Sequence, residues 1–367
     1  MQPMVTDLTR RNLLKAALLS STGLSTLSSD AFASVKQQSP TLIGCSVQGK
    51  GRYSAVVADK TGVPIFKLPI PDRGHGVAVC QKRALAVVFA RRPGSYFQPF
   101  NFITGEELAL KVAEPGRHYY GHGAFSNDGK WLYTTEGDVT SNGLIGVYDV
   151  DDNFKKVDEF SGFGIGPHEL IVLQDDTIVV GVGGVQTDGR KPTNLESMKP
   201  SLSYLDKTGR LIEQVGLDDH KLSIRHLSTF KGIAAKDEFV VCGQQYRGEP
   251  DDFPSLIGIH RRGEPIQLLN AEPEEWARFN HYIASVAVIG DHLLATSPRG
   301  NCYGIWSVSK NRLLELDFLP DASGVVSLNN QFVVSSGSGK VVVRDANKIE
   351  YKINSGIQWD NHWSSIS

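Results

Sequence analysis

The segment Gly74–Val79, which reads GHGVAV, decides the fold because related strand openings recur along the chain. Each opening starts with a His or a small residue, continues as an apolar β-branched run, and is followed by a turn and a second apolar strand. Two of the later members, Ser285–Ile289 and Gly324–Leu328, keep the strand but lose the His. The other six openings are Gly121–Ser126, Pro167–Val172, Arg225–Phe230, Ser285–Ile289, Gly324–Leu328 and Asp360–Trp363.

The spacing of these openings identifies a repeat. Between His75 and His362 they lie 47, 46, 58, 59, 39 and 38 residues apart. Their mean of about 48 residues is close to the ~40–50 residues of a four-stranded propeller blade. Seven openings therefore predict seven blades. The competing architecture, a pair of β-sandwiches, does not predict regularly spaced strands that begin with His.

The ends of the chain fit a closed ring. Only five residues follow His362, which is enough for one strand. Three unpaired strand candidates precede His75, at residues 41–46, 53–58 and 64–68. One C-terminal strand and three N-terminal strands complete a seventh blade and leave no free sheet edge. The sequence thus predicts an all-β, seven-bladed β-propeller with WD40- or YVTN-like repeats, closed by pairing the C-terminal strand with the N-terminal strands.

The composition agrees with a turn-rich β protein. Glycine accounts for 37 of 367 residues, more than the usual ~7%, and interior glycines disfavour helices. The net charge of -2, from 38 basic and 40 acidic residues, gives no footprint for nucleic acid. None of the four cysteines forms a C-x-x-C pair, so we expect buried free thiols, with one disulfide as the alternative.

The N-terminus resembles an export signal. Thr9–Lys15 carries two adjacent arginines followed by apolar residues and Lys, as in twin-arginine signals. A short apolar run, Ala16–Leu27, precedes the small-x-small site Ala31–Ala33. We expect residues 1–33 to be a twin-arginine signal peptide and residues 34–367 to be a periplasmic propeller with no further membrane span. The alternative is a basic, apolar helix at the start of a cytoplasmic protein.

Five of the seven strand openings begin with or contain a His. In a propeller these strands line the central channel, so the imidazoles are expected to converge at one axial mouth. Neutral imidazoles suit Fe, Cu or Zn. The alternative is structural, since a strand His can tie one blade to the next through a ring N–H. The predicted metal ligands are His75, His122, His168, His226 and His362.

Polar residues near the starts of the first strands and the ends of the second strands are expected at the same mouth. The arginines would repel a bare cation and attract an anion, whereas a metal complex with an anionic component would use both sets. The predicted ligand-binding residues are Arg91, Arg92, Arg117, Tyr119, Glu136, Arg225, Gln244, Arg299 and Asp360.

Six motifs resemble a bacterial family of twin-arginine-exported proteins, domain of unknown function 1513. They are Arg91–Gly94, Arg117–Gly123, Gly164–His168, Leu222–Leu227, Thr296–Gly300 and Trp359–His362. The similarity extends from about residue 40 to the end. The resemblance implies a propeller and, through neighbouring genes for imelysin-like and di-haem oxidase-like periplasmic proteins, a role and partners in iron or other metal handling. It implies no particular activity.

Three functions remain open from the sequence. The first is a periplasmic propeller that binds a transition metal or metal complex at its axial mouth, for metal acquisition or handling. The second is an oxidoreductase or lyase, with the arginines holding an anionic small molecule and a His as acid or base. The third is a protein-interaction scaffold.

Overall fold

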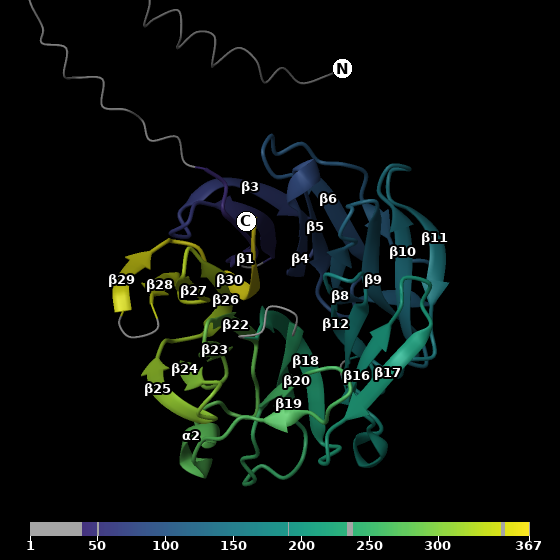
Figure 1. The fold of residues 1–367 in the computed structure, drawn as a ribbon. Helices are drawn as coiled ribbons and strands as arrows, with labels where there is room; N and C mark the ends of the chain where they lie inside the picture. Colours follow the sequence, from purple (N-terminus) through teal and green to yellow (C-terminus); the bar gives the residue numbers. More distant parts are fainter. Residues whose placement is uncertain (1–38, 50, 190, 233–237, 346–348, 367) are drawn as a thin grey trace, which may run out of the picture. The chain divides into compact units, whose positions relative to one another are not determined.

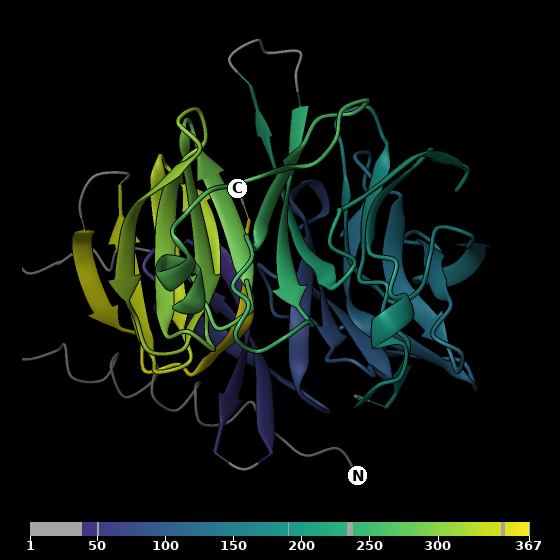
Figure 2. The same ribbon diagram turned by 90° about the horizontal axis from the view of Figure 1, so that it is seen from below.

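Seven four-stranded antiparallel sheets surround a central axis in the computed structural model (Figure 1). The structure describes residues 39–49, 51–189, 191–232, 238–345 and 349–366. These residues belong to one compact unit, Ser39–Ser367. The predicted signal peptide, residues 1–33, lies outside the described residues. In the view turned by 90°, the strands extend between two ends where the connecting turns gather (Figure 2).

Blades 1 to 3 follow one another along the chain. Blade 1 contains β4 (Gly74–Cys80), β5 (Leu85–Ala90), β6 (Tyr96–Asn101) and β7 (Lys111–Val112). Blade 2 contains β8 (Arg117–Phe125), β9 (Trp131–Asp138), β10 (Gly143–Asp149) and β11 (Lys155–Phe160). Blade 3 contains β12 (Pro167–Val172), β13 (Ile178–Val182), β16 (Ser201–Leu205) and β17 (Leu211–Gly216).

Blades 4 to 6 repeat this order. Blade 4 contains β18 (Leu222–Lys231), β19 (Glu238–Tyr246), β20 (Ile257–His260) and β21 (Gln267–Leu268). Blade 5 contains β22 (Ser285–Ile289), β23 (His292–Ser297), β24 (Cys302–Ser307) and β25 (Arg312–Phe318). Blade 6 contains β26 (Ala322–Leu328), β27 (Gln331–Ser336), β28 (Lys340–Arg344) and β29 (Ile349–Asn354).

Short elements occupy the connections. They are the 3₁₀ turns Gln81–Arg83 and Leu195–Ser197, the hairpin β14 (Thr187–Asp188) and β15 (Lys191–Pro192), and the helix α2 (Pro273–Ala277). No helix in the described part of the chain has the length and apolar character needed to cross a bilayer.

The seventh blade closes the ring as the sequence predicts. It contains β30 (Trp359–Ser365), β1 (Leu42–Gln48), β2 (Arg52–Ala58) and β3 (Pro64–Ile70). The C-terminal strand β30 is innermost and pairs antiparallel with β1, for example at Leu42 opposite Ser365. This pairing joins the two ends of the described chain and leaves no inner strand without a neighbour.

The hydrophobic core is divided among the blade interfaces. The described residues form seven apolar clusters, one between each pair of adjacent blades. Side chains alternate along a strand, so neighbouring residues enter different clusters. In β27, Val333 packs toward the closing blade and Val334 toward blade 5. Both faces of these strands are buried, which explains their continuous apolar runs.

The four cysteines match the expectation from the sequence. Cys45, Cys80, Cys242 and Cys302 are all buried and free. Burial raises the pKa of Cys242 to about 12 and that of Cys302 to about 12, so these thiols stay protonated at neutral pH.

The inner strands differ from the sequence prediction where they begin. His122 and His226 lie well inside β8 and β18 rather than at their first residues. Pairing with the second strand shifts register at or beside the His in β4, β8, β12, β18 and β30. Of the two inner strands without His, β26 also shifts, between Ala322 and Val325, whereas β22 pairs without a shift. An extra residue bends a strand and redirects its side chains. These shifts therefore place the imidazoles within the channel.

Candidate metal centre

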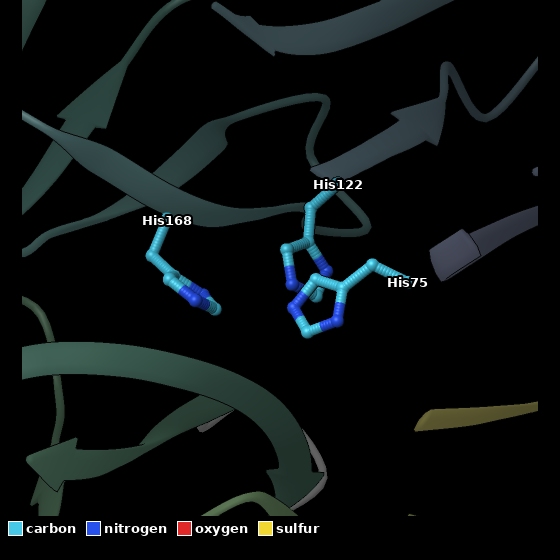
Figure 3. A group of neighbouring side chains, drawn as sticks. All are labelled: His75, His122 and His168. Carbon is cyan, nitrogen blue, oxygen red and sulfur yellow. The ribbon is translucent and has the colours of Figure 1, made fainter. Parts of the chain in front are cut away.

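Five imidazoles form a layer across the axis, here called the His layer: His75, His122, His168, His226 and His362. Each comes from a different inner strand, and all five are buried. The ring centroids of His75 and His362 are 4.5 Å apart, as are those of His226 and His362. Figure 3 shows His75, His122 and His168 projecting toward one another from β4, β8 and β12. The predicted convergence of the five side chains is therefore present.

Each ring of the His layer has a buried nitrogen that lacks a hydrogen-bond partner in the described structure. Such atoms are rare in folded proteins and call for a ligand or water. Burial is the largest cause that lowers the pKa of every one of these rings well below its ordinary value. Neighbouring charges add to this effect, as Arg225 does at His168 and His226. The rings are therefore neutral at pH 7 and keep a lone pair for a metal.

Two triads bring their donor atoms within 4.8 Å of one another. One is His75, His122 and His168, and the other is His122, His226 and His362. Bonds of about 2.0–2.1 Å to imidazole place three donors on one ion roughly 3.4 Å apart in tetrahedral geometry. A pair of donors at the 4.8 Å limit must therefore approach by more than about 1 Å before a triad can hold one ion. His122 belongs to both triads, so it is central to either arrangement.

Glu169 distinguishes the second triad. Its Oε1 lies 3.7 Å from Nδ1 of His122, and its Oε2 lies 3.4 Å from Nδ1 of His226, without hydrogen-bond geometry. The backbone N–H of Leu227 donates to Oε2 at 2.9 Å. Burial raises the pKa of Glu169, while His122 and this N–H oppose the change. Its side chain, 23% exposed, lines a cavity. A carboxylate at this place can orient the rings and offset the charge of an ion.

Two glycines allow β4 and β8 to approach closely enough for the layer to form. A Cβ on Gly76 would lie 2.6 Å from the carbonyl oxygen of Gly121 and 2.7 Å from Nδ1 of His122. A Cβ on Gly121 would lie 2.8 Å from Cδ2 of His75, and this residue has a φ of +101°. Neither position has room for a side chain.

Two cavities adjoin the His layer. The first, of about 220 Å³, is lined by His122, His226, His362 and Glu169, together with residues that follow the His along the inner strands. The second, of about 530 Å³, is lined by His75 and His168, together with residues that precede the His. The first is called the Glu169 cavity and the second the arginine cavity. The His layer therefore separates a carboxylate-bearing cavity from a cationic one.

Several predicted ligand-binding residues meet in the arginine cavity. Arg91, Arg92, Arg225 and Arg299 all line it. Asp360 lies directly behind the lining, where its buried carboxylate accepts a hydrogen bond from Nε of Arg73 at 2.5 Å. These five residues come from blades 1, 4, 5 and the closing blade or the turns beside them, so ring closure brings them together.

Four other predicted ligand-binding residues line neither cavity. Nη2 of Arg117 donates to Glu159 at 3.1 Å, and the hydroxyl of Tyr119 lies 3.1 Å from that of Tyr148. Gln244 is buried within blade 4 and donates to the sulfur of Cys242 at 3.2 Å. The sequence placed these residues near the correct end of a strand but not on the correct face, because successive side chains alternate.

Glu136 is the fourth of these residues and belongs to a network inside blade 2. Its Oε1 accepts hydrogen bonds from Thr134 and from Tyr148, each at 2.7 Å. Its Oε2 accepts one from Lys156 at 2.9 Å. All three of these hydrogen-bond partners lie within blade 2, so Glu136 stabilises this blade rather than lining a cavity.

Sequence reasoning missed several residues of the arginine cavity. Arg73 stands two residues before His75, as Asp360 does before His362, and this shared offset was a usable signal. Arg247 directly follows the last residue of β19, Tyr246. Tyr282 and Asp321 precede β22 and β26, the two inner strands that lack a His. No His in the repeat therefore points to these two residues in the sequence.

The fold is shared with solved structures of diverse proteins. The chain is similar to hydrazine synthase of Kuenenia stuttgartiensis, at 16% identity and a TM-score of 0.60 over 81% of this chain and 90% of that one. It is also similar to the WD40 repeats of RRP9, at 14% identity and a TM-score of 0.56 over 86% of each chain. BamB of Moraxella catarrhalis gives 13% identity and a TM-score of 0.51 over 85% of each chain.

These structural likenesses concern the propeller alone, because the identities are low. None of the curated proteins matches the sequence. A family model described as "Protein of unknown function (DUF1513)" matches residues 68–366. This range contains all five residues of the His layer and every arginine of the cavity beside it. The chain therefore belongs to the DUF1513 family.

Proposed function

We propose that this protein binds one transition-metal ion through His122, His226 and His362 and serves in metal acquisition or handling. The observation that carries the proposal is the convergence of three neutral, buried imidazoles, each with an unpartnered nitrogen, beside the carboxylate of Glu169. Fe(II), Cu(II) and Zn(II) all accept such a donor set.

The second triad is preferred over the first because of charge. His75 and His168 line the arginine cavity, where guanidinium groups repel a cation. His122, His226 and His362 line the other cavity with Glu169, whose negative charge attracts one. Arginines also act on the second triad, Arg225 on His122 and His226 and Arg91 on His362. The carboxylate of Glu169 is therefore what favours a cation at this triad over the first.

The test is a calorimetric titration of metal-free protein with Zn(II), Cu(II) and Fe(II). Metal analysis after gel filtration then measures how much of each ion the protein retains. We expect one equivalent of at least one metal to be retained. His122→Gln removes a donor shared by both triads and should reduce affinity at least 100-fold. The proposal is refuted if the wild-type protein retains no metal after exposure to a saturating concentration of each ion. It is also refuted if His122→Gln binds metal with the same affinity as the wild type.

His118→Gln is the matched control. The ring of His118 packs beside Tyr120, with centroids 4.8 Å apart, and is outside both triads. This variant should retain one equivalent of metal with wild-type affinity. Loss of binding in both variants would instead indicate a general defect in folding.

The cellular setting is part of the same proposal. The twin-arginine motif at Arg10 and Arg11 supports export of the folded protein to the periplasm, where imelysin-like or di-haem proteins are the proposed partners. Cell fractionation should find the mature protein in the periplasm. Replacing both arginines by Lys should leave the precursor in the cytoplasm, and an unchanged distribution would contradict the proposed export route.

A further inference from the structure

The arginine cavity has a charge imbalance that the metal site does not explain. Of its titratable side chains other than His and Tyr, six are arginines and one is an aspartate, Asp321. The arginines are Arg73, Arg91, Arg92, Arg225, Arg247 and Arg299. A concave site with this composition concentrates anions.

Arg225 is the most deeply placed of these arginines. It is buried, with 7% of its surface exposed, and its Nη2 donates to Oε1 of Gln245 at 3.0 Å. Nη2 of Arg247 donates to the same oxygen at 2.9 Å. One neutral amide oxygen therefore serves two guanidinium groups and neutralises neither. The Nε atoms of Arg225 and Arg247 are buried and without a hydrogen-bond partner in the described structure.

The acidic groups nearby do not balance this charge. Asp360 is paired with Arg73, at the edge of the cavity. Burial and the charge of Asp360 raise the pKa of Asp321. Burial, followed by repulsion from Arg92 and Arg247, lowers the pKa of Arg225 well below its ordinary value. A buried cation with no counter-charge is costly to the folded protein unless a ligand supplies that charge.

Tyrosine hydroxyls add polar groups to the same wall. The hydroxyl of Tyr120 is buried beside Ser141, and the guanidinium of Arg92 lies 5.9 Å from its ring centroid. The guanidinium of Arg299 lies 4.9 Å from the ring centroid of Tyr282. These rings lie against two guanidinium groups beside the cavity.

We infer that the arginine cavity binds a small oxyanion that carries two or more negative charges, a polycarboxylate or a phosphate, with Arg225, Arg247 and Tyr120 as hydrogen-bond donors. Bidentate pairing of guanidinium with carboxylate or phosphate supplies the recognition. The cavity volume of about 530 Å³ accommodates an anion of this size.

The experiment measures anion binding by calorimetry on metal-free protein, with citrate as the polycarboxylate and inorganic phosphate as the second probe, against chloride at equal ionic strength. Binding of either probe supports the inference, and the stronger probe identifies the class. Arg225→Gln and Arg247→Gln should each weaken binding at least tenfold. Arg117→Gln, which lies outside the cavity, should bind as the wild type does.

Thermal unfolding separates ligand binding from a structural role of Arg225. Citrate or phosphate should raise the Tm of the wild type but not that of Arg225→Gln. Without either probe, Arg225→Gln should be at least as stable as the wild type, because it loses an unbalanced buried charge. A lower Tm of the variant in anion-free buffer, or failure of both probes to bind wild type, would overturn the inference.

This result is independent of the metal site. Arg225→Gln should still retain one equivalent of metal, because His122, His226 and His362 remain. If metal binds and neither anion does, the inference fails while the proposed function stands. If an anion binds and no metal does, the proposed function fails while the inference stands.

Discussion

Acidification should destabilise the metal-free protein at unusually mild pH. All five rings of the His layer have pKa values that burial lowers in the folded protein. In the unfolded chain the same rings titrate near the ordinary value of about 6.5. As the pH falls through this value, the unfolded state takes up protons that the folded state does not. Stability is therefore greatest above pH 6.5 and declines as the pH is lowered toward the folded-state pKa values.

The number of rings sets the expected size of this effect. Each His that stays neutral in the folded state contributes up to about 1.4 kcal/mol per pH unit below its unfolded-state pKa. Five such rings give an upper limit of about 7 kcal/mol per pH unit. Total stabilities are typically about 5–15 kcal/mol, so one pH unit should remove a large part of the free energy of unfolding.

Glu169 opposes this trend weakly. Burial raises its pKa in the folded protein, so proton uptake by this carboxylate favours the folded state as the pH falls. This effect begins at the raised folded-state pKa and is complete only below the ordinary value for Glu, so it offsets part of the effect of the rings. Because five rings act against one carboxylate, the range from pH 7 to pH 5.5 reports mainly on the His layer.

The assay is urea unfolding of metal-free protein, monitored by tryptophan fluorescence, at pH 7.0, 6.5, 6.0 and 5.5. His122→Gln should reduce the slope of unfolding free energy against pH by up to about 1.4 kcal/mol per unit. Replacement of the exposed His220 by Gln should not change it. Stability that stays constant over this range, or the same slope in His122→Gln and wild type, would refute the assignment of neutral rings.

Three further changes test other parts of the structure. Gly76→Ala places Cβ 2.6 Å from the carbonyl oxygen of Gly121, so it should abolish metal binding and lower the free energy of unfolding by about 1–3 kcal/mol. In the control Gly216→Ala, the nearest atom to Cβ is 3.5 Å away, so neither property should change. Calorimetry measures metal binding, and urea unfolding measures stability. Truncation after Gln358 removes β30 and exposes the edge of β1, so gel filtration should show aggregates, and a soluble monomer would contradict the closure. Glu136→Gln should lower the free energy of unfolding by about 1–3 kcal/mol yet leave metal affinity unchanged, since its partners lie within blade 2.

The ring and its closure can be predicted from the sequence because the repeat period is visible in the spacing of residues along the chain. The spacing between His75 and His362 and the three strands before His75 are local patterns that survive without any structural information. Which face of a strand a residue occupies depends on register, which the sequence pattern does not fix where both faces are buried. This explains why Arg91 and Arg299 line the arginine cavity while Glu136 and Gln244 turn into their blades.

The same limitation explains why one predicted mouth is in fact two cavities of different charge. Residues at or shortly before the openings, such as Arg225, Tyr282 and Asp321, line the arginine cavity. Residues directly after the His, such as Glu169 and Leu227, line the other. An offset of one residue on either side of a His thus decides which side of the layer a charge occupies. Glu169 lines the cavity of the proposed metal triad, while Arg225 lines the opposite cavity. Arg225 still acts on His122 and His226, so in the proposed function Glu169 offsets part of this repulsion.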